Sequence, residues 1–325
     1  MLIYDHALWL LLAALLLDAI VGDPDWLWRR LPHPVVWIGR TISWFDTHLN
    51  KSALSSQQRK LGGFLTLMFL VIGGLLAGAG LHAISGRIPH GDIVVVIIAA
   101  VFIAQKSLYQ HVAAVRDGLN SGGLEGGRKA VSMIVGRDPD RLDEAGISRA
   151  AIESCSENFS DGVVAPVFWF AVLGLPGLLA YKAVNTADSM IGHKNERYSD
   201  FGWAAARFDD LINLPASRLS GLFIALSAPM AGGSIKNSFS CILKDSAQHR
   251  SPNAGWPEAA MAGALNLALA GPRVYPGYTV EDPYMNASGR KDASARDIAR
   301  ALAVMVTASA IQGALIAVTA IATLF

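Results

Sequence analysis

Apolar residues in this chain are gathered into blocks that approach the length of a membrane-crossing helix. About 20 consecutive apolar residues are needed to cross roughly 30 Å of hydrocarbon. Hydrophobic residues make up 52% of the 325 residues and charged residues only 16%, whereas soluble domains carry about a quarter charged residues. The sequence therefore predicts an all-α, polytopic integral membrane protein.

Six hydrophobic blocks carry this prediction, and we take residues 1–325 as a single membrane-embedded domain. The blocks cover about residues 7–21, 63–84, 91–110, 163–184, 211–233 and 299–325. The first block lacks the basic start and the small-residue cleavage site of a signal peptide, so we interpret it as a retained anchor. Small residues in block 63–84 would let another helix approach closely. We expect four to five hydrophobic helices together with large helical loops in the cytoplasm.

Two of these blocks are interrupted by proline. Block 163–184 contains Pro166 and the run Gly174-Leu175-Pro176-Gly177, which breaks a helix. Broken helices at membrane depth persist only where protein or a water-filled cavity covers the freed backbone groups. We expect a broken or re-entrant segment that turns back, or else an odd number of extra crossings, so that Asn185 emerges in the cytoplasm. Block 211–233 either spans with a ragged entry or lies partly in the interface.

The distribution of charge limits the function and sets the orientation. With 27 Lys and Arg against 26 Asp and Glu, the net charge of +1 gives no electrostatic case for nucleic-acid binding. The two cysteines lie far apart and form no disulfide framework or zinc ribbon. Loop 23–62 holds six basic residues and loop 105–162 holds seven, whereas the short link 85–92 holds one. The positive-inside rule therefore places both long loops in the cytoplasm.

Polar residues cluster beside the hydrophobic blocks. His33 and Trp37 lie in a Pro-rich and Trp-rich segment, which an interfacial aromatic belt would also explain. Glu153, Glu157 and Asp161 recur every four residues, which places three like charges on one helical face. A divalent ion or a substrate ammonium group would compensate them, and a solvated acidic face is the alternative.

The densest cluster runs from Asn185 to Tyr198 directly after a hydrophobic block. Asn185, Asp188 and Gly192 share a helical face, and the following residues supply donors for phosphate and acceptors for an amine or a metal. A fourth cluster, Asp245 to Glu258, is rich in turn residues and includes Arg250 and Asn253. It predicts a shaped loop that opens a helix over residues 258–270.

Four motifs follow one another along the chain. They are His33-Pro34-Val35-Val36-Trp37-Ile38-Gly39 after Asp23-Pro24, Glu157-Asn158-Phe159-Ser160-Asp161-Gly162-Val163-Val164-Ala165-Pro166, Asn185-Thr186-Ala187-Asp188-Ser189-Met190-Ile191-Gly192-His193-Lys194, and Ser251-Pro252-Asn253-Ala254-Gly255-Trp256-Pro257-Glu258. In this order they resemble the CobD/CbiB family, the adenosylcobinamide-phosphate synthases of cobalamin biosynthesis. The resemblance covers essentially the whole chain.

The resemblance implies an enzyme of the bacterial cytoplasmic (inner) membrane. Such an enzyme joins (R)-1-amino-2-propanol, or its O-phosphate, to the propionate carboxylate of adenosylcobyric acid by amide formation. The resemblance also implies ATP as co-substrate with Mg²⁺, although no nucleotide-binding fingerprint is visible. Whether other late cobalamin enzymes dock at the membrane is left open by the sequence.

Residue types suggest roles for the motif side chains in that reaction. We expect Asp161, Asp188, His193 and Lys194 to converge on one catalytic pocket, with carboxylates that hold Mg²⁺ or take the ammonium proton and cations that bind phosphate or an oxyanion. The predicted metal ligands are Glu153, Glu157 and Asp161. The predicted substrate-binding residues are His33, Trp37, Asn158, Asn185, Arg197, Arg250 and Asn253.

Two other classes of function stay open. A membrane phosphotransferase shares the opening Asp161-Gly162-Val163-Val164-Ala165, but apolar residues follow here where that motif continues with Arg and spaced aspartates. A transporter or carrier of a charged small molecule would use Asp18 inside the first block and the broken 163–184 segment. Against a transporter, the polar residues gather in loops rather than along the helices.

Overall fold

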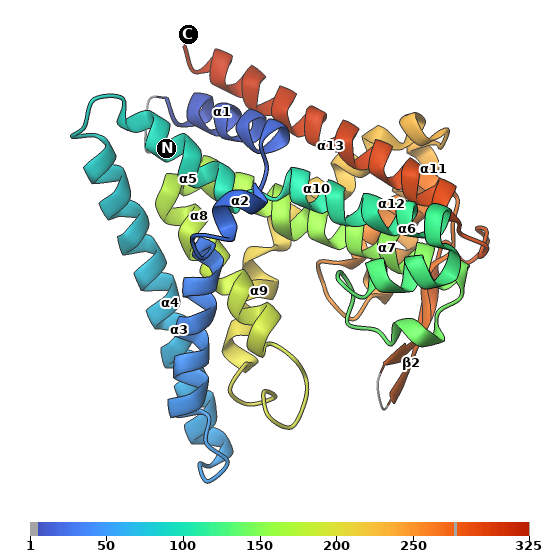
Figure 1. The fold of residues 1–325 in the computed structure, drawn as a ribbon, viewed down its shortest axis with the longest axis horizontal. Coiled ribbons are helices and arrows are strands. Elements are labelled where there is room, and N and C mark those ends of the chain that lie inside the picture. The colour runs from blue at the N-terminus through green and yellow to red at the C-terminus, as the bar shows by residue number, and fades with distance from the viewer. Residues whose placement is uncertain (1–5, 276–277, 325) are drawn as a thin grey trace. The chain divides into compact units, whose positions relative to one another are not determined.

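The computed structural model describes residues 6–275 and 278–324, and it confirms the predicted helical architecture (Figure 1). The described residues also form one two-stranded antiparallel sheet, in which β1 (Leu269–Tyr275) pairs with β2 (Tyr278–Met285). This hairpin corrects the expected helix 258–270. Helix α12 (Gly255–Leu265) ends early because Asn266 adopts a left-handed φ of 54°, a backbone conformation that commonly terminates helices.

The chain packs into two compact units, and each unit is built from segments that are distant in sequence. The prediction of one domain over residues 1–325 did not anticipate this division into two units. Unit 1 comprises Met1–Ala104, Ala165–Asn213 and Thr319–Phe325, and unit 2 comprises Gln105–Val164 and Leu214–Val318.

Unit 1 is organised around the contact between helices α4 (Ser56–Ser85) and α8 (Ala165–Ile191). A Cβ added at Gly74 would lie 2.7 Å from Ala180 Cα, and one at Gly78 would lie 2.4 Å from Pro176 Cα. These glycines let the two backbones touch, as expected from the small residues of this block. The other helices of unit 1 are α1 (Ala7–Ile20), α2 (Asp25–Trp28), α3 (Pro34–Leu49), α5 (Gly91–Phe102) and α9 (Trp203–Ile212).

Unit 2 contains helix α12 at its centre, packed against α10 (Leu214–Ser227) and α11 (Ile235–Asp245). Helix α6 (Gln105–Val131) packs against α7 (Glu144–Phe159). The remaining elements are η1 (Pro139–Arg141), the π-helical η2 (Ser160–Val164), η3 (Ala228–Ala231), η4 (Ser246–Gln248) and most of α13 (Ala295–Ala322). Ten of the eleven residues of α12 are buried, which identifies it as a core helix.

Four helical segments of the described chain are long and apolar enough to cross a membrane, and a fifth results if Trp203–Ile212 and Leu214–Ala231 are counted as one broken span. The four are Ser56–Ser85, Gly91–Val131, Glu144–Ile191 and Ala295–Ala322. The chain is thus a multi-pass membrane protein with the predicted number of apolar helices. Helix α1 has only 14 residues, about 21 Å at 1.5 Å per residue. It is too short to span alone, which corrects the expectation for block 7–21.

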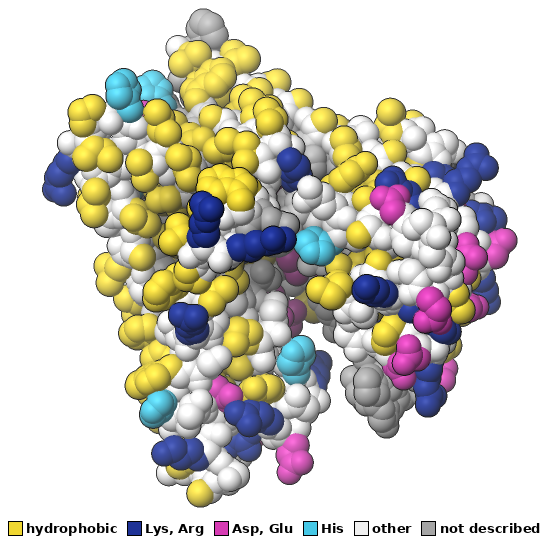
Figure 2. Space-filling view, viewed as in Figure 1, with side chains coloured by type: hydrophobic (Ala, Val, Ile, Leu, Met, Phe, Trp, Pro, Cys, Tyr) yellow, Lys and Arg dark blue, Asp and Glu magenta, His cyan; other side chains and the backbone are white. Residues whose placement is uncertain are grey.

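Hydrophobic side chains gather on the surface over α3 and α4 (Figure 2). On α4 they include Phe64, Phe69 and Leu76, and Leu76 keeps 67% of its surface exposed. Large exposed apolar faces are costly in water but favourable in lipid. The outer face of α4 is therefore suited to contact acyl chains.

A Gly-Leu-x-Gly turn reverses the helix direction at two places in the described part of the chain, once in each unit. Gly174 in α8 has φ 66° and ψ −152°, and Gly123 in α6 has φ 58° and ψ −147°. A Cβ at Gly177 would lie 2.4 Å from the carbonyl oxygen of Trp169, eight residues earlier, and one at Gly126 would lie 2.3 Å from that of Gly118. In a straight helix, eight residues span about 12 Å. The 163–184 block therefore turns back, as predicted from its sequence.

Candidate functional site

The end of α8 and the helix α9 bring together three acidic residues of unit 1, which we call the α8–α9 carboxylate cluster: Asp188, Asp209 and Asp210. Asp209 is buried, with 7% of its surface exposed. Asn213 donates from Nδ2 to Asp209 Oδ2 at 2.9 Å, and the hydroxyl of Tyr181 donates to Asn213 Oδ1 at 3.0 Å. This chain of hydrogen bonds fixes one oxygen of the buried carboxyl.

The other oxygen of Asp209, Oδ1, is buried and accepts no hydrogen bond from the described residues. Asp188 and Asp210 both lie within electrostatic range of Asp209, and Asn185 lies beside it. Like charges in a partly dry environment repel each other strongly. The cluster is therefore a place where a cation, such as an ammonium group, would be stabilised.

Two basic side chains border the carboxylate cluster. His193 lies within electrostatic range of Asp188, and Lys194 within range of Asp210. Both side chains are exposed and follow directly on the end of α8. The site thus holds negative charge on α8 and α9 and positive charge in the loop beside them.

Gly192 explains how the Asn185-to-Lys194 motif keeps Asp188 in place. A Cβ at position 192 would lie 2.0 Å from Asp188 Oδ1 and 2.6 Å from its carbonyl oxygen. Any larger residue would push the carboxyl aside. Of the residues predicted to converge, Asp188, His193 and Lys194 lie near one another in unit 1, and Asn185, which was predicted to bind substrate, lies beside Asp209.

The loop after Lys194 is fastened to α3 and α4. Arg197 donates to Asp46 at 2.6 Å, and this hydrogen bond raises the pKa of the Arg197 guanidinium. Arg59 donates to the carbonyl oxygens of Glu196 and Arg197. The structure therefore gives Arg197 a role in holding the loop, and its predicted contact with substrate stays a prediction.

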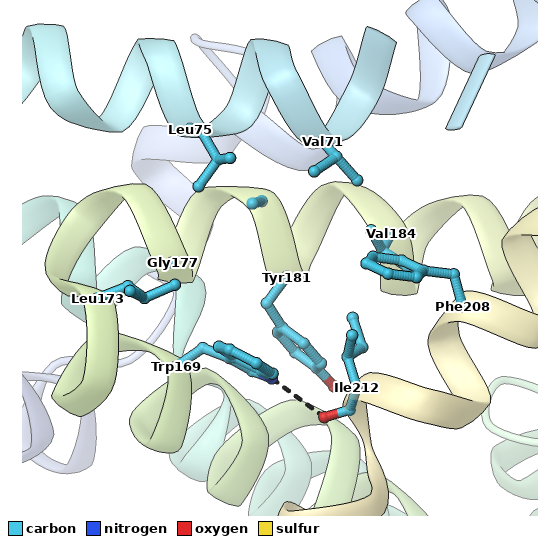
Figure 3. Close-up of a pocket in the computed structure, with 10 residues that line it drawn as sticks. Val71, Leu75, Trp169, Leu173, Gly177, Tyr181, Val184, Phe208 and Ile212 are labelled. Atoms are coloured by element: carbon cyan, nitrogen blue, oxygen red, sulfur yellow. Dashed lines mark hydrogen bonds between the residues drawn. The ribbon is translucent and has the colours of Figure 1, made fainter. Parts of the chain in front are cut away.

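An apolar cavity of about 140 Å³ adjoins the hydrogen-bonded chain (Figure 3). Tyr181 lines it together with Trp169, whose Nε1 donates to the carbonyl oxygen of Ile212 at 3.2 Å. The two rings project from the two halves of α8 toward α9. The Gly174 reversal therefore places aromatic side chains beside the residue that anchors Asp209.

Unit 2 contains a separate polar pocket of about 160 Å³. Its lining includes Arg137, Glu153, Glu157, Asn158 and Glu258. Arg137 donates to Glu153 Oε2, and Ala270 N–H donates to Oε1 at 2.8 Å. Glu153 is 3% exposed. The cation that offsets the charge of this carboxylate is thus an arginine of the chain.

Glu157, Asn158 and Asp161 continue the predicted acidic face. Glu157 and Asn158 are exposed, and Asn158 donates to the carbonyl oxygen of Ser154 at 2.9 Å. Asp161 lies in the π-helical η2. Across the described residues, no three His, Cys, Asp or Glu side chains are arranged to hold a metal ion. The geometry therefore gives no support to the predicted metal site at Glu153, Glu157 and Asp161.

The predicted residues near the N-terminus belong to unit 1. His33 caps α3, where its Nδ1 accepts from Val35 N–H at 3.2 Å, and its Nε2 lies 3.6 Å from Asp23. Trp37 is 59% exposed and lines an apolar pocket of about 250 Å³ between α3, α4, α5 and α8. An exposed indole beside an apolar pocket is available to a flat ligand or to lipid.

The fourth motif is a rigid loop of unit 2. Asn253 is 5% exposed, and its Oδ1 accepts from Ser217 and from Arg218, each at 3.0 Å. Arg250 donates from Nε to Asp282 at 2.8 Å, while its side chain keeps 61% of its surface exposed. These contacts hold the loop against α10 and the β-hairpin, and the predicted substrate contacts of Asn253 and Arg250 stay predictions.

Asp209, Tyr181 and Arg137 were missed as site residues by sequence reasoning. A partial signal existed for Asp209, because it lies one helical turn before Asn213. Tyr181 lies within a hydrophobic block, and Arg137 lies in a turn-rich segment far from Glu153 in sequence. No local pattern links these two residues to their partners.

Comparison with known proteins accounts for the four motifs. The family model described as CobD/Cbib protein matches residues 11–305. The chain belongs to the CobD/CbiB family. It is 55% identical over 307 residues to the cobalamin biosynthesis protein CobD of Sinorhizobium sp, which covers 92% of this chain and 94% of the relative. The CobD of Brucella suis biovar 1 is 55% identical over 89% of both chains, and that of Rhodobacter capsulatus is 46% identical over 90% of this chain and 91% of its own.

No solved structure matches this chain. The present structure places the CobD/CbiB motifs in both units of the chain. In it, the Asn185-to-Lys194 motif belongs to unit 1, and the motifs around Asp161 and Asn253 belong to unit 2.

Proposed function

We propose that this CobD/CbiB protein acts in cobalamin biosynthesis as an amide-forming enzyme. It would join aminopropanol, or aminopropanol O-phosphate, to the propionate carboxylate of adenosylcobyric acid. Membership of the family over residues 11–305 is the observation that carries this proposal. The α8–α9 carboxylate cluster with its adjacent cations supports it, because the phosphorylated amine carries an ammonium group and a phosphate group a few bonds apart.

In this proposal, Asp188 and Asp209 bind the ammonium group of the amine. An ammonium group is no nucleophile until it loses a proton, and a carboxylate beside it can accept that proton. Asp188 is only partly buried and is placed to accept that proton, while the charge of Asp209, whose Oδ1 is buried beside Asn185, favours the cation. The neutral amine then attacks the activated carbonyl carbon, and a C–N bond forms.

His193 and Lys194 bind the phosphate group of the same substrate. Both side chains are exposed and belong to the loop that follows α8, at the edge of the carboxylate cluster. Charge-assisted hydrogen bonds to phosphate oxygens are stronger than neutral ones. The ammonium group of the substrate would thus face the carboxylates, and its phosphate group would face His193 and Lys194.

Amide formation from a free carboxylate requires activation, and we propose ATP as the co-substrate. Transfer of a phosphoryl group to the propionate oxygen would let that oxygen leave as phosphate when the amine attacks. The described residues do not fit a resident metal site, since no three of their His, Cys, Asp or Glu side chains, those of the carboxylate cluster included, are arranged to hold a metal ion. We therefore propose that Mg²⁺ arrives with the nucleotide phosphates, where it usually keeps several waters and needs few protein ligands.

Purified protein in nanodiscs tests the proposal. Incubation with adenosylcobyric acid, aminopropanol phosphate and each nucleotide in turn, followed by mass spectrometry, should give the amide product and identify the nucleotide consumed. Asp188→Asn and Asp209→Asn should each lower kcat/KM by about a hundredfold or more, while Asp117→Asn, on an exposed side chain, should not. Full activity of Asp188→Asn and Asp209→Asn would overturn the assignment. Uptake of cobyric acid into vesicles without product would instead indicate a carrier.

The phosphate assignment has its own test. Lys194→Ala should raise the KM for aminopropanol phosphate by roughly tenfold to a hundredfold, because one charge-assisted contact is lost. It should change the KM for unphosphorylated aminopropanol much less. Equal losses for the two amines would mean that Lys194 serves another substrate or the fold.

We also propose that the protein lies in the bacterial inner membrane with the carboxylate cluster facing the cytoplasm. Ser199, exposed in the loop after Lys194, is a suitable labelling position. A cysteine introduced by Ser199→Cys should resist a membrane-impermeant maleimide added to intact cells and react after the inner membrane is opened. Labelling in intact cells would reverse the orientation.

A further inference from the structure

A second charged cavity lies in unit 2, at the start of α13, and its lining shares no residue with the polar pocket around Glu153. Its volume is about 470 Å³, and it is lined by Ala231, Arg290, Ser294, Arg296, Asp297 and Arg300. The lining side chains carry three positive charges and one negative charge. Such a cavity has room for a group many times larger than one water, whose share of liquid volume is about 30 Å³.

Asp297 organises two of the three arginines. It is 3% exposed, and its Oδ1 accepts from Arg290 at 2.7 Å and from Arg300 at 2.8 Å. Its Oδ2 accepts from the backbone N–H and the hydroxyl of Ser294, each at 3.1 Å. Both carboxylate oxygens of Asp297 are thus hydrogen-bonded within unit 2. Because one of them accepts from both Arg290 and Arg300, Asp297 holds the two guanidinium groups in place.

Arg300 is held further by backbone carbonyl groups. Its Nε donates to Ala231 O at 3.0 Å, and its Nη1 donates to Leu265 O at 3.2 Å. Arg290 also contacts Asp292, at 3.2 Å, and Asp292 lies outside the lining with 82% of its side chain exposed. Asp297 and Asp292 therefore offset the charge of the arginines only in part.

Arg296 differs from the other two arginines. It is exposed on the first turn of α13, and it forms no hydrogen bond or ion pair with any residue in the described part of the chain. Its planar guanidinium offers five N–H donors in a fork that matches the oxygens of a phosphate group. The amide groups at the start of a helix add a positive potential to the same place.

We propose that this cavity is a binding site for a phosphate group, with Arg296 as the unpaired donor and with Arg290 and Arg300 held in position by Asp297. The net charge of +2 on the lining matches a phosphate monoester dianion, and multiple guanidinium groups are the usual protein ligands of phosphate. Two sources share this chemistry: a phosphorylated small molecule, and the headgroup of an acidic phospholipid, since α13 continues into a candidate membrane span. The proposal does not depend on the proposed amide-forming activity.

Binding to the full-length protein in nanodiscs tests the site, with inorganic phosphate as the first probe. In discs of phosphatidylcholine, titration calorimetry should detect phosphate binding that Arg296→Gln weakens by about tenfold or more. Arg296→Lys, which keeps the charge, should lose less. Arg296 is the position to change because it belongs to no internal contact, so the fold should persist. Arg141→Gln is the matched control, since Arg141 is 69% exposed and does not line the cavity.

A second arm distinguishes the lipid from the free phosphate. In discs that contain phosphatidylglycerol, native mass spectrometry should show that lipid retained by the wild-type protein and released by Arg296→Gln if the headgroup is the ligand. Loss on Arg296→Gln in either arm supports the proposal and identifies the source. The proposal is overturned if neither probe distinguishes Arg296→Gln from wild type, or if Arg141→Gln produces the same loss.

Discussion

Replacing Gly78 by alanine should separate α4 from α8, and the structure gives the size of the effect. The new Cβ would lie 2.4 Å from both Cα and N of Pro176, whereas ordinary contacts begin near 3.4 Å. The backbones must therefore move apart by about 1 Å. Pro176 cannot yield by changing a rotamer, because the atoms struck belong to the backbone. Overpacking of this kind costs typically about 1–3 kcal/mol, and we expect the upper half of that range.

Gly80 provides a matched control on the same helix. No heavy atom lies within 4 Å of a Cβ added at Gly80. Both substitutions gain the same helix propensity, up to about 1 kcal/mol for alanine over glycine. The difference in the free energy of unfolding between Gly78→Ala and Gly80→Ala therefore isolates the packing cost. Titration from mild detergent into SDS, followed by circular dichroism, measures it.

The same pair of variants should also separate in function. Helix α8 carries Asp188, so a displacement of α8 should reduce amide formation in Gly78→Ala and leave it unchanged in Gly80→Ala. If the two variants unfold within about 0.5 kcal/mol of each other, the usual scatter of surface substitutions, then α4 and α8 do not touch at Gly78 and the reasoning fails.

Three further predictions concern buried polar groups. Tyr181→Phe should lower the free energy of unfolding by about 1–3 kcal/mol, because Asn213 Oδ1 is left without this donor at 1% exposure; an unchanged denaturant midpoint would contradict it. Arg137→Gln should lower the free energy of unfolding by about 3–5 kcal/mol, because it removes the cation beside buried Glu153. Adding Glu153→Gln should restore much of this free energy in the same assay, and no recovery would disprove the pairing. Burial raises the pKa of the Cys241 thiol to about 11, so its maleimide labelling should be slow at pH 8 and keep rising with pH above 9, and a plateau near pH 9 would count against it.

Sequence reasoning predicted much of the helical architecture, because the signals involved are local. The apolar runs that become α4 and α13 are long enough to identify by composition alone. The break at Gly174 was visible as a Gly-Leu-Pro-Gly run, and the structure confirms the reversal of the chain there. By contrast, the β-hairpin after α12 was missed, because strand pairing between β1 and β2 stabilises a segment that composition alone assigns to a helix.

The candidate site was predicted in part. Within one motif, Asn185, Asp188, His193 and Lys194 lie close together because ten residues of sequence keep them close. The prediction that Asp161 joins them stays untested.

The sequence by itself determined where this chain is apolar, where its helices must break, and which family motifs it carries. Only the tertiary structure decided that Asp209 is buried beside Asp188, that Arg137 compensates Glu153, and that Asp297 orients two arginines. The physical reason is the range of the interactions. The length of an apolar run and the local backbone conformation depend on residues that are neighbours in sequence. The ionic or hydrogen-bonding partner of a buried charge depends instead on which distant segment the folded chain packs against it.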